Sequence, residues 1–295
     1  MKRVVYTSCY VPGPWIAAHG LEPCLLPVKG LSDRESNGPV EGVCAYVRAF
    51  VSEVLADETI GAVVLTTTCD QMRRAFDWII SESRVPVFLM TIPRLQASSY
   101  NRDLYRKEVE RLGRFLEDLG GHSPCRETLG QALTASCEPE THCPLASDRD
   151  KVRLALVGGP LAVQDRTLFT LVESCGGQVV LDATETGLLG QPNGQPGDSD
   201  DPWEVLIRRY FVQRWDVGRR PNGELYDWLK PQLEAVAVKG VLFRWNLWCD
   251  LWHGELACFK QHIDLPVLGI EATGNFSADQ PRLLTRIGAF VEMFK

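Results

Sequence analysis

Two cysteines occupy matching positions in two units of the chain that share one local plan. Cys69 and Cys249 each follow a strand-like run, precede an aspartate and open a helix-like run. At the same spacing after each cysteine comes a proline, Pro86 or Pro266, that leads the next strand-like run. A thiol where a strand opens into a helix faces free backbone N–H groups and the positive end of the helix dipole. We therefore expect a lowered thiol pKa and a thiolate that can bind metal.

A third candidate ligand is Cys44, which lies in the first turn of a predicted helix over 43–56, again at a positive helix end. Cys9 follows the first predicted strand, would lie at the same sheet edge, and is the reserve candidate. Asp70 and Asp250 are interpreted as helix caps. Three thiolates match an iron–sulfur cluster, since a cubane held by three protein sulfurs leaves one iron free for substrate or water.

The remaining cysteines fit such a site less well. Cys24 and Cys175 lie in or beside apolar elements, as buried cysteines commonly do, and Cys258 lies in the middle of a predicted helix. Cys137 and Cys143 flank the segment EPETH and could bind zinc together with His142, although their spacing is unspecific. The sequence contains no Cys-x-x-Cys pair, so zinc-ribbon and thioredoxin-type sites have no support.

Composition places the chain among globular proteins. It has 295 residues, of which 45% are hydrophobic and 23% charged. A net charge of −7 argues against a nucleic-acid or anionic-membrane partner. We expect no transmembrane helix, because no run of 18 apolar residues occurs, and no signal peptide, because prolines interrupt the first apolar run. The expected location is the cytoplasm, where the ten cysteines would stay reduced.

Strands and helices alternate along both halves of the chain. We expect a first α/β domain at 1–120, a linker rich in Gly, Pro, Ser and acidic residues at 121–150, and a second domain at 151–295. The second domain would end in a helix over 280–295. This alternation predicts an α/β fold with two doubly wound, mainly parallel sheets of Rossmann or flavodoxin type. Ligands of such sheets bind beyond the carboxyl ends of the strands, so the two domains should face a shared cleft.

Motifs spread from end to end of the chain point to one family. They are YTSCYVPGPWIAAHG (6–20), VCAY (43–46), TTCDQMRR (67–74), IPR (92–94), WCD with Glu255 (248–255) and QPR followed by TRIGAF (280–290). Together they resemble the motifs of the 2-hydroxyacyl-CoA dehydratase and benzoyl-CoA reductase family, the dehydratase D-component, which includes the double-cubane cluster proteins. The corner TTCDQMRR is the most specific of them.

The resemblance implies that Cys44, Cys69 and Cys249 hold a [4Fe-4S] cluster in each subunit. It implies an oxygen-sensitive lyase or reductase of anaerobic metabolism that pairs with a homologous subunit, as a heterodimer or homodimer. A separate ATP-hydrolysing iron–sulfur activator would supply single electrons. In the dehydratases an electron forms a ketyl radical anion at the thioester of an acyl-CoA, which expels hydroxide from the neighbouring carbon. In the benzoyl-CoA reductases the ring is reduced.

Two other functions stay open at this point. In the double-cubane branch, six cysteines of a homodimer hold an [8Fe-9S] cluster and small molecules are reduced. Alternatively, the chain is a non-catalytic partner or scaffold subunit whose cysteines bind no iron. One departure bears on the choice: the family's Tyr-Val-Pro turn continues with glutamates, whereas here Gly13, Pro14 and Trp15 follow. The missing carboxylate makes dehydration by this chain alone less expected.

The sequence indicates a CoA-binding site less clearly than it indicates the candidate metal ligands. Arg73, Arg74, Arg94 and Arg286 are candidate phosphate contacts, because guanidinium groups pair well with phosphate. Solvated surface arginines are the alternative interpretation. The motifs do not indicate which substrate is used.

Overall fold

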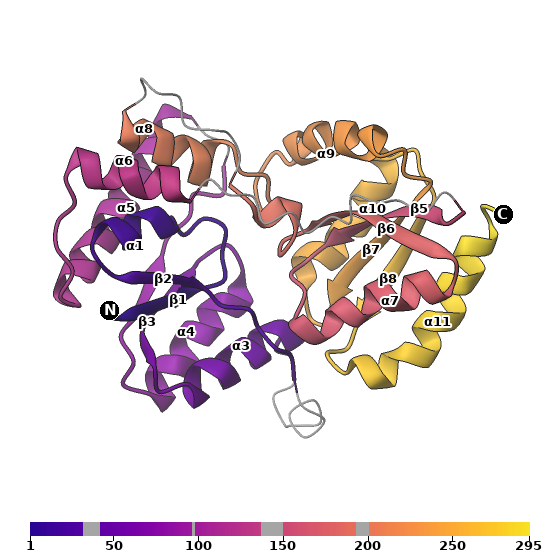
Figure 1. The fold of residues 1–295 in the computed structure, drawn as a ribbon, viewed down its shortest axis with the longest axis horizontal. Helices are drawn as coiled ribbons and strands as arrows, with labels where there is room; N and C mark the ends of the chain where they lie inside the picture. The colour runs from indigo at the N-terminus through magenta and orange to yellow at the C-terminus, as the bar shows by residue number, and fades with distance from the viewer. Residues whose placement is uncertain (32–41, 96–97, 137–149, 193–200) are drawn as a thin grey trace.

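The structure is a computed structural model that describes residues 1–31, 42–95, 98–136, 150–192 and 201–295. Within these ranges the chain forms two units side by side, each built on a four-stranded parallel sheet with helices on both faces (Figure 1). The expected fold class, two doubly wound parallel-sheet domains, is confirmed. The zinc hypothesis for Cys137 and Cys143 falls outside the described residues.

The first unit has the strand order β2-β1-β3-β4. Its strands are β1 (Arg3–Tyr6), β2 (Glu22–Leu25), β3 (Ile60–Thr66) and β4 (Val87–Met90). Its helices are α1 (Gly13–Ala18), α3 (Ala45–Ala56), α4 (Asp70–Glu82), α5 (Ser99–Asp118) and α6 (Arg126–Ala135).

The second unit repeats this order as β6-β5-β7-β8. Its strands are β5 (Val152–Gly158), β6 (Gly177–Thr184), β7 (Gly240–Asn246) and β8 (Val267–Ala272). Helices α7 (Thr167–Ser174), α9 (Gly223–Ala235), α10 (Asp250–His262) and α11 (Phe276–Glu292) flank it. Helix α11 begins earlier than the expected residue 280, because the Asn275 side chain accepts a hydrogen bond from the N–H of Ala278 and caps the helix.

Each sheet is buried on both faces, which explains the nearly continuous apolar strands. Along β3, Ala62 and Val64 pack toward α1 and α5, whereas Val63 and Leu65 pack toward α3 and α4. This follows from the two-residue period of a strand. The central strands are thereby held between two helical layers, and their carboxyl ends are fixed in position.

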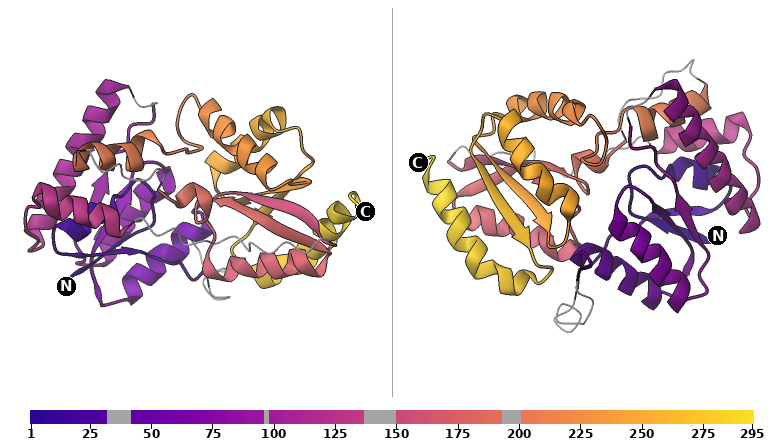
Figure 2. Two further views of the ribbon diagram at one scale, coloured as in Figure 1. Left: turned by 45° about the horizontal axis from the view of Figure 1, so that its top comes forward. Right: turned by 180° about the vertical axis from the view of Figure 1, so that it is seen from behind.

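A segment late in the sequence packs on the first unit. Helix α8 (Pro202–Ile207) and the π-helical turn Arg208–Val212 lie against α5 and α6, as the two views of Figure 2 agree. Trp203 packs against Trp15 with tilted rings whose centroids are 4.7 Å apart, and Phe211 stacks on Tyr105 at 4.8 Å. The chain therefore returns to the first unit's core before it completes the second sheet.

No helix in the described ranges is both long enough and apolar enough to cross a lipid bilayer.

Candidate metal centre between the two sheets

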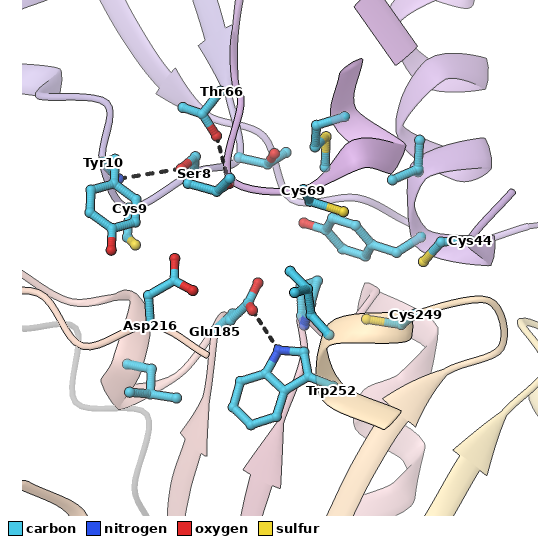
Figure 3. Close-up of a pocket in the computed structure, with 18 of the residues that line it drawn as sticks. Ser8, Cys9, Tyr10, Cys44, Thr66, Cys69, Glu185, Asp216, Cys249 and Trp252 are labelled. Carbon is cyan, nitrogen blue, oxygen red and sulfur yellow. Dashed lines mark hydrogen bonds between the residues drawn. The ribbon is translucent and has the colours of Figure 1, made fainter. Parts of the chain in front are cut away.

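A pocket of about 90 Å³ lies where the carboxyl ends of the two sheets face each other (Figure 3). Three segments contribute lining side chains. Residues 7–10 follow β1, residues 68–72 lead from β3 into α4, and residues 246–252 lead from the end of β7 into the first turn of α10. The expectation of a shared cleft at this edge of both sheets agrees with this geometry.

Three helix starts deliver a cysteine each to this pocket. Cys44, Cys69 and Cys249 are the residues immediately before α3, α4 and α10, and all three line the cavity. In Figure 3 Cys44 and Cys69 project from the first unit and Cys249 projects from the second toward them. The structure thus brings together the three thiols that the sequence singled out.

Local contacts fix the relative positions of these helix starts. The Gln71 side chain accepts a hydrogen bond from the Cys44 N–H at 3.2 Å and donates one to the Gly42 carbonyl at 3.3 Å, which joins the starts of α3 and α4. On the second unit, Trp248 has φ = 67°, a left-handed conformation that is uncommon for a bulky residue. This turn at the end of β7 places Cys249 before α10.

The prediction that Asp70 and Asp250 cap their helices was wrong by one residue. The cap position belongs to the cysteine in both units, and each aspartate is the first residue inside its helix. A carboxylate in the first turn still interacts favourably with the helix dipole. The Asp70 side chain is exposed and lies 3.6 Å from the Arg73 guanidinium.

The expected lowering of the thiol pKa values was wrong. Burial raises the pKa of Cys69 to about 11, although the N–H groups of Gln71 and Met72 partly offset it. Burial also raises the pKa of Cys44 and of Cys249, and for Cys249 the neighbouring Cys44 adds to the effect. The free-energy cost of removing a thiolate from water is larger here than the stabilisation that the helix N-terminus gives it. Metal binding to these thiols must therefore displace protons.

Cys9 lines the same pocket but at another place. Figure 3 shows it beside Tyr10, across the cavity from Cys44 and Cys249. Burial raises its pKa, while the Arg214 guanidinium, which interacts with the thiol, acts in the opposite direction. Its separation from the other three thiols leaves it as a reserve ligand.

Among the described residues, no three His, Cys, Asp or Glu side chains converge tightly enough to hold a single metal ion. Cys44, Cys69 and Cys249 line one pocket but do not form such a group. Ligands of a cluster of several irons bind different atoms of it and so lie farther apart than ligands of one ion. Of the other cysteines, Cys24 and Cys175 are partly buried against the cores, and Cys258 is exposed on α10.

None of the four candidate phosphate-binding arginines lines the pocket, and all four are exposed. Arg94 contacts a residue that lines the pocket, because its guanidinium donates to the carbonyl of Thr68, the residue before Cys69, at 3.1 Å. Arg73 lies beside Asp70 in the first turn of α4, and Arg286 donates to the Gly269 carbonyl in the middle of β8 at 2.8 Å.

The helix that carries Gly13, Pro14 and Trp15 is buried in the first core. A Cβ atom on Gly13 would lie 2.5 Å from the Tyr6 hydroxyl, so the space for a longer side chain is already taken. The carboxylates that line the pocket are instead Glu185 and Asp216, both from the later half of the chain. Sequence reasoning missed both, although the place of Glu185 directly after a buried strand was a usable signal.

Nearly the whole chain matches a known protein family. The chain matches the family described as 2-hydroxyglutaryl-CoA dehydratase, D-component, over residues 8–142 and 127–294. A relative in Escherichia coli (strain K12), YjiM, whose name describes a dehydratase subunit, is 21% identical over 286 residues, covering 78% of this chain and 73% of the relative.

Among solved structures, two of the SBP FpvC of Pseudomonas aeruginosa align with the whole chain. The complex with Mn²⁺ is 12% identical, covers 99% of FpvC and has a TM-score of 0.27; the complex with Ni²⁺ is 11% identical, covers 98% and has a TM-score of 0.28. Scores this low carry no argument about function.

Proposed function

Because the chain belongs to the 2-hydroxyglutaryl-CoA dehydratase D-component family, we propose that it is the iron–sulfur subunit of an acyl-CoA dehydratase or reductase. In this proposal Cys44, Cys69 and Cys249 hold a [4Fe-4S] cluster. The observation that supports it best is the meeting of three thiols, from three helix starts and both units, at one pocket.

The residues present fit such a cluster chemically. Thiolates are the usual protein ligands of iron–sulfur clusters, and three of them leave one iron open. Three helix starts direct backbone N–H groups toward the site, which favours a bound anion. When bound, the cluster would supply single electrons at low potential. The surrounding side chains are mostly apolar, so they would keep water away from the reacting groups.

The proposal extends to partners and location. A homologous subunit would complete the enzyme, as the word component in the family description suggests. An ATP-dependent iron–sulfur activator would deliver the electrons, and an acyl-CoA would be the substrate. A cytoplasmic location accords with thiols that must stay reduced to bind iron.

A second function is favoured by the size of the pocket. Its volume of about 90 Å³ is small beside the roughly 300–1,000 Å³ of sites that enclose a drug-sized ligand, and no described arginine lines it. Both features fit a homodimeric reductase of small molecules that holds an [8Fe-9S] double cubane. A non-catalytic subunit with empty cysteines is the third possibility.

Anaerobic expression with iron counting and electron paramagnetic resonance separates these functions. The main proposal expects about four iron atoms per chain, paramagnetic signals of a cubane, and binding of 2-hydroxyglutaryl-CoA as the probe acyl-CoA. An iron-loaded homodimer with coupled clusters and no acyl-CoA binding supports the double cubane instead. A colourless protein without iron would contradict both and favour the scaffold subunit.

A further inference from the structure

Two carboxylates enter the pocket from the second half of the chain, and neither belongs to the proposed ligand set. Glu185 is the residue directly after β6, and Asp216 lies in the loop between the π-helical turn and α9. In Figure 3 both carboxylates point into the cavity, across from Tyr10 of the first unit. The Glu185 side chain is exposed and lines the cavity.

Glu185 is held in place by the helix that Cys249 opens. The indole Nε1 of Trp252, a side chain only 2% exposed, donates a hydrogen bond to one Glu185 oxygen at 2.5 Å. Trp252 lies in the first turn of α10, so the carboxyl group and the Cys249 thiol are fixed to the same rigid element. The other carboxyl oxygen accepts no hydrogen bond from any described residue and points into the pocket in Figure 3.

The opposite wall supplies a buried hydroxyl, that of Tyr10. Tyr10 is 1% exposed, and its hydroxyl has no well-formed hydrogen bond within the described part of the chain. In Figure 3 this hydroxyl points toward Asp216, and a weak interaction between them lowers the Asp216 pKa while burial raises it. Apart from this weak interaction, the Tyr10 hydroxyl has no hydrogen bond among the described residues, so it can bind a polar ligand that enters the pocket.

The surroundings keep Glu185 able to hold or release a proton near neutral pH. Burial raises its pKa to about 7, the negative charge of Asp216 adds to this, and the Trp252 hydrogen bond partly offsets it. No described lysine or arginine lines the pocket to counter the effect. The other titratable groups that line the pocket with Glu185 come from several elements: Asp216, Tyr10, Cys9, Cys44 immediately before α3, Tyr46 on α3, Cys69 before α4 and Cys249 before α10.

We propose that Glu185 is the proton-exchanging residue of this pocket, and that Asp216 and Tyr10 line the path of that proton. This inference rests on the proposed function, because it needs a substrate reduced beside the three cysteines. In the step assigned to Glu185, its O–H bond breaks and the proton joins the leaving hydroxyl oxygen of the substrate. That oxygen takes the electron pair of its C–O bond, water departs, and solvent returns a proton to the carboxylate.

The test is the midpoint reduction potential of the iron-loaded, full-length protein as a function of pH, without substrate. Adding an electron to the pocket increases the affinity of a nearby carboxylate for a proton. The wild-type potential should therefore fall as the pH rises through the range in which Glu185 loses its proton. Glu185→Gln preserves shape and an oxygen for Trp252, so it should retain iron but lose this dependence. Asp216→Asn removes a negative neighbour and should shift the dependence to lower pH.

Glu271→Gln is the matched control, because Glu271 also accepts a hydrogen bond from a tryptophan indole, that of Trp245 at 3.3 Å, but does not line the pocket. It should behave as the wild type. As a second measurement, infrared spectra of wild-type protein labelled with ¹³C-glutamate should lose a protonated-carboxyl band near pH 7.

The outcomes separate the two proposals. A wild-type protein without iron overturns the proposed function and this inference with it. An iron-loaded wild type whose potential ignores pH, or whose pH dependence survives in Glu185→Gln, overturns the inference alone. A missing glutamate band near neutral pH in the wild-type infrared spectra would do the same.

Discussion

Replacing Cys249 by alanine is expected to remove most of the iron and leave the fold intact. Cys249 borders the pocket, so loss of its sulfur opens no new closed cavity in a core. We therefore expect the free energy of unfolding of the iron-free protein to fall by no more than about 1 kcal/mol. For a chain of this size that is a fall in Tm of no more than about 2–4 °C.

The assay pairs anaerobic iron counting with thermal unfolding of the iron-free protein. Loss of one of three thiolates weakens the cluster without touching the sheets, so iron content and Tm should respond differently. Cys258→Ala is the control, because Cys258 is exposed on the same helix and should keep all iron. Full iron in Cys249→Ala, or equal loss in both variants, refutes the ligand assignment. A much larger fall in Tm would show that Cys249 acts through folding instead.

Three further predictions concern the elements that position the pocket. Asp165→Ala should cost about 3–5 kcal/mol in a denaturant titration, because it leaves the buried Arg244 guanidinium without the carboxylate that lies 2.5 Å away; a loss under 1 kcal/mol would contradict this. Gly158→Ala should cost about 1–3 kcal/mol, since Gly158 has φ = 149° and an added Cβ would lie 1.9 Å from the Arg244 carbonyl oxygen; an unchanged Tm would argue against it. The iron-free wild type should lose stability as the pH rises from about 5 to 8, because the pKa of Glu185 is about 7 in the folded state against an ordinary 4.5. The folded state holds this proton more tightly, so the contribution is complete below the unfolded value and is lost through pH 7. Glu185→Gln should reduce the difference in Tm between these pH values, and an equal difference in both proteins would rule the explanation out.

The architecture was readable from the sequence because its signals are local. Apolar runs bounded by Gly and Pro marked the strands, and helix-like spacing marked the helices between them. Parallel sheets followed from that alternation alone. The helix starts at Cys69 and Cys249 were also readable, since a polar residue between a strand and a helix lies at the ligand-binding edge of such a sheet.

Other features depended on packing that no local pattern encodes. Helix α8 joins the core of the first unit through Trp203, although its neighbours in sequence lead to the second sheet. The pKa values of Cys69 and Cys249 are raised, where the sequence predicted that they would be lowered. Their desolvation depends on tertiary packing, and local sequence patterns do not show how closely the two units approach. Asp216 reached the pocket through a loop with no distinctive signal.

The sequence by itself determined the kind of fold and the three cysteines that end up at one edge, because strand–helix corners are set by short-range hydrogen bonding and the chain's own periodicity. Only the tertiary structure decided which groups face those thiols across the boundary of the two units. Glu185, Asp216 and Tyr10 come from segments far apart in the chain, and the charge each can carry depends on how completely the opposite unit excludes water from them.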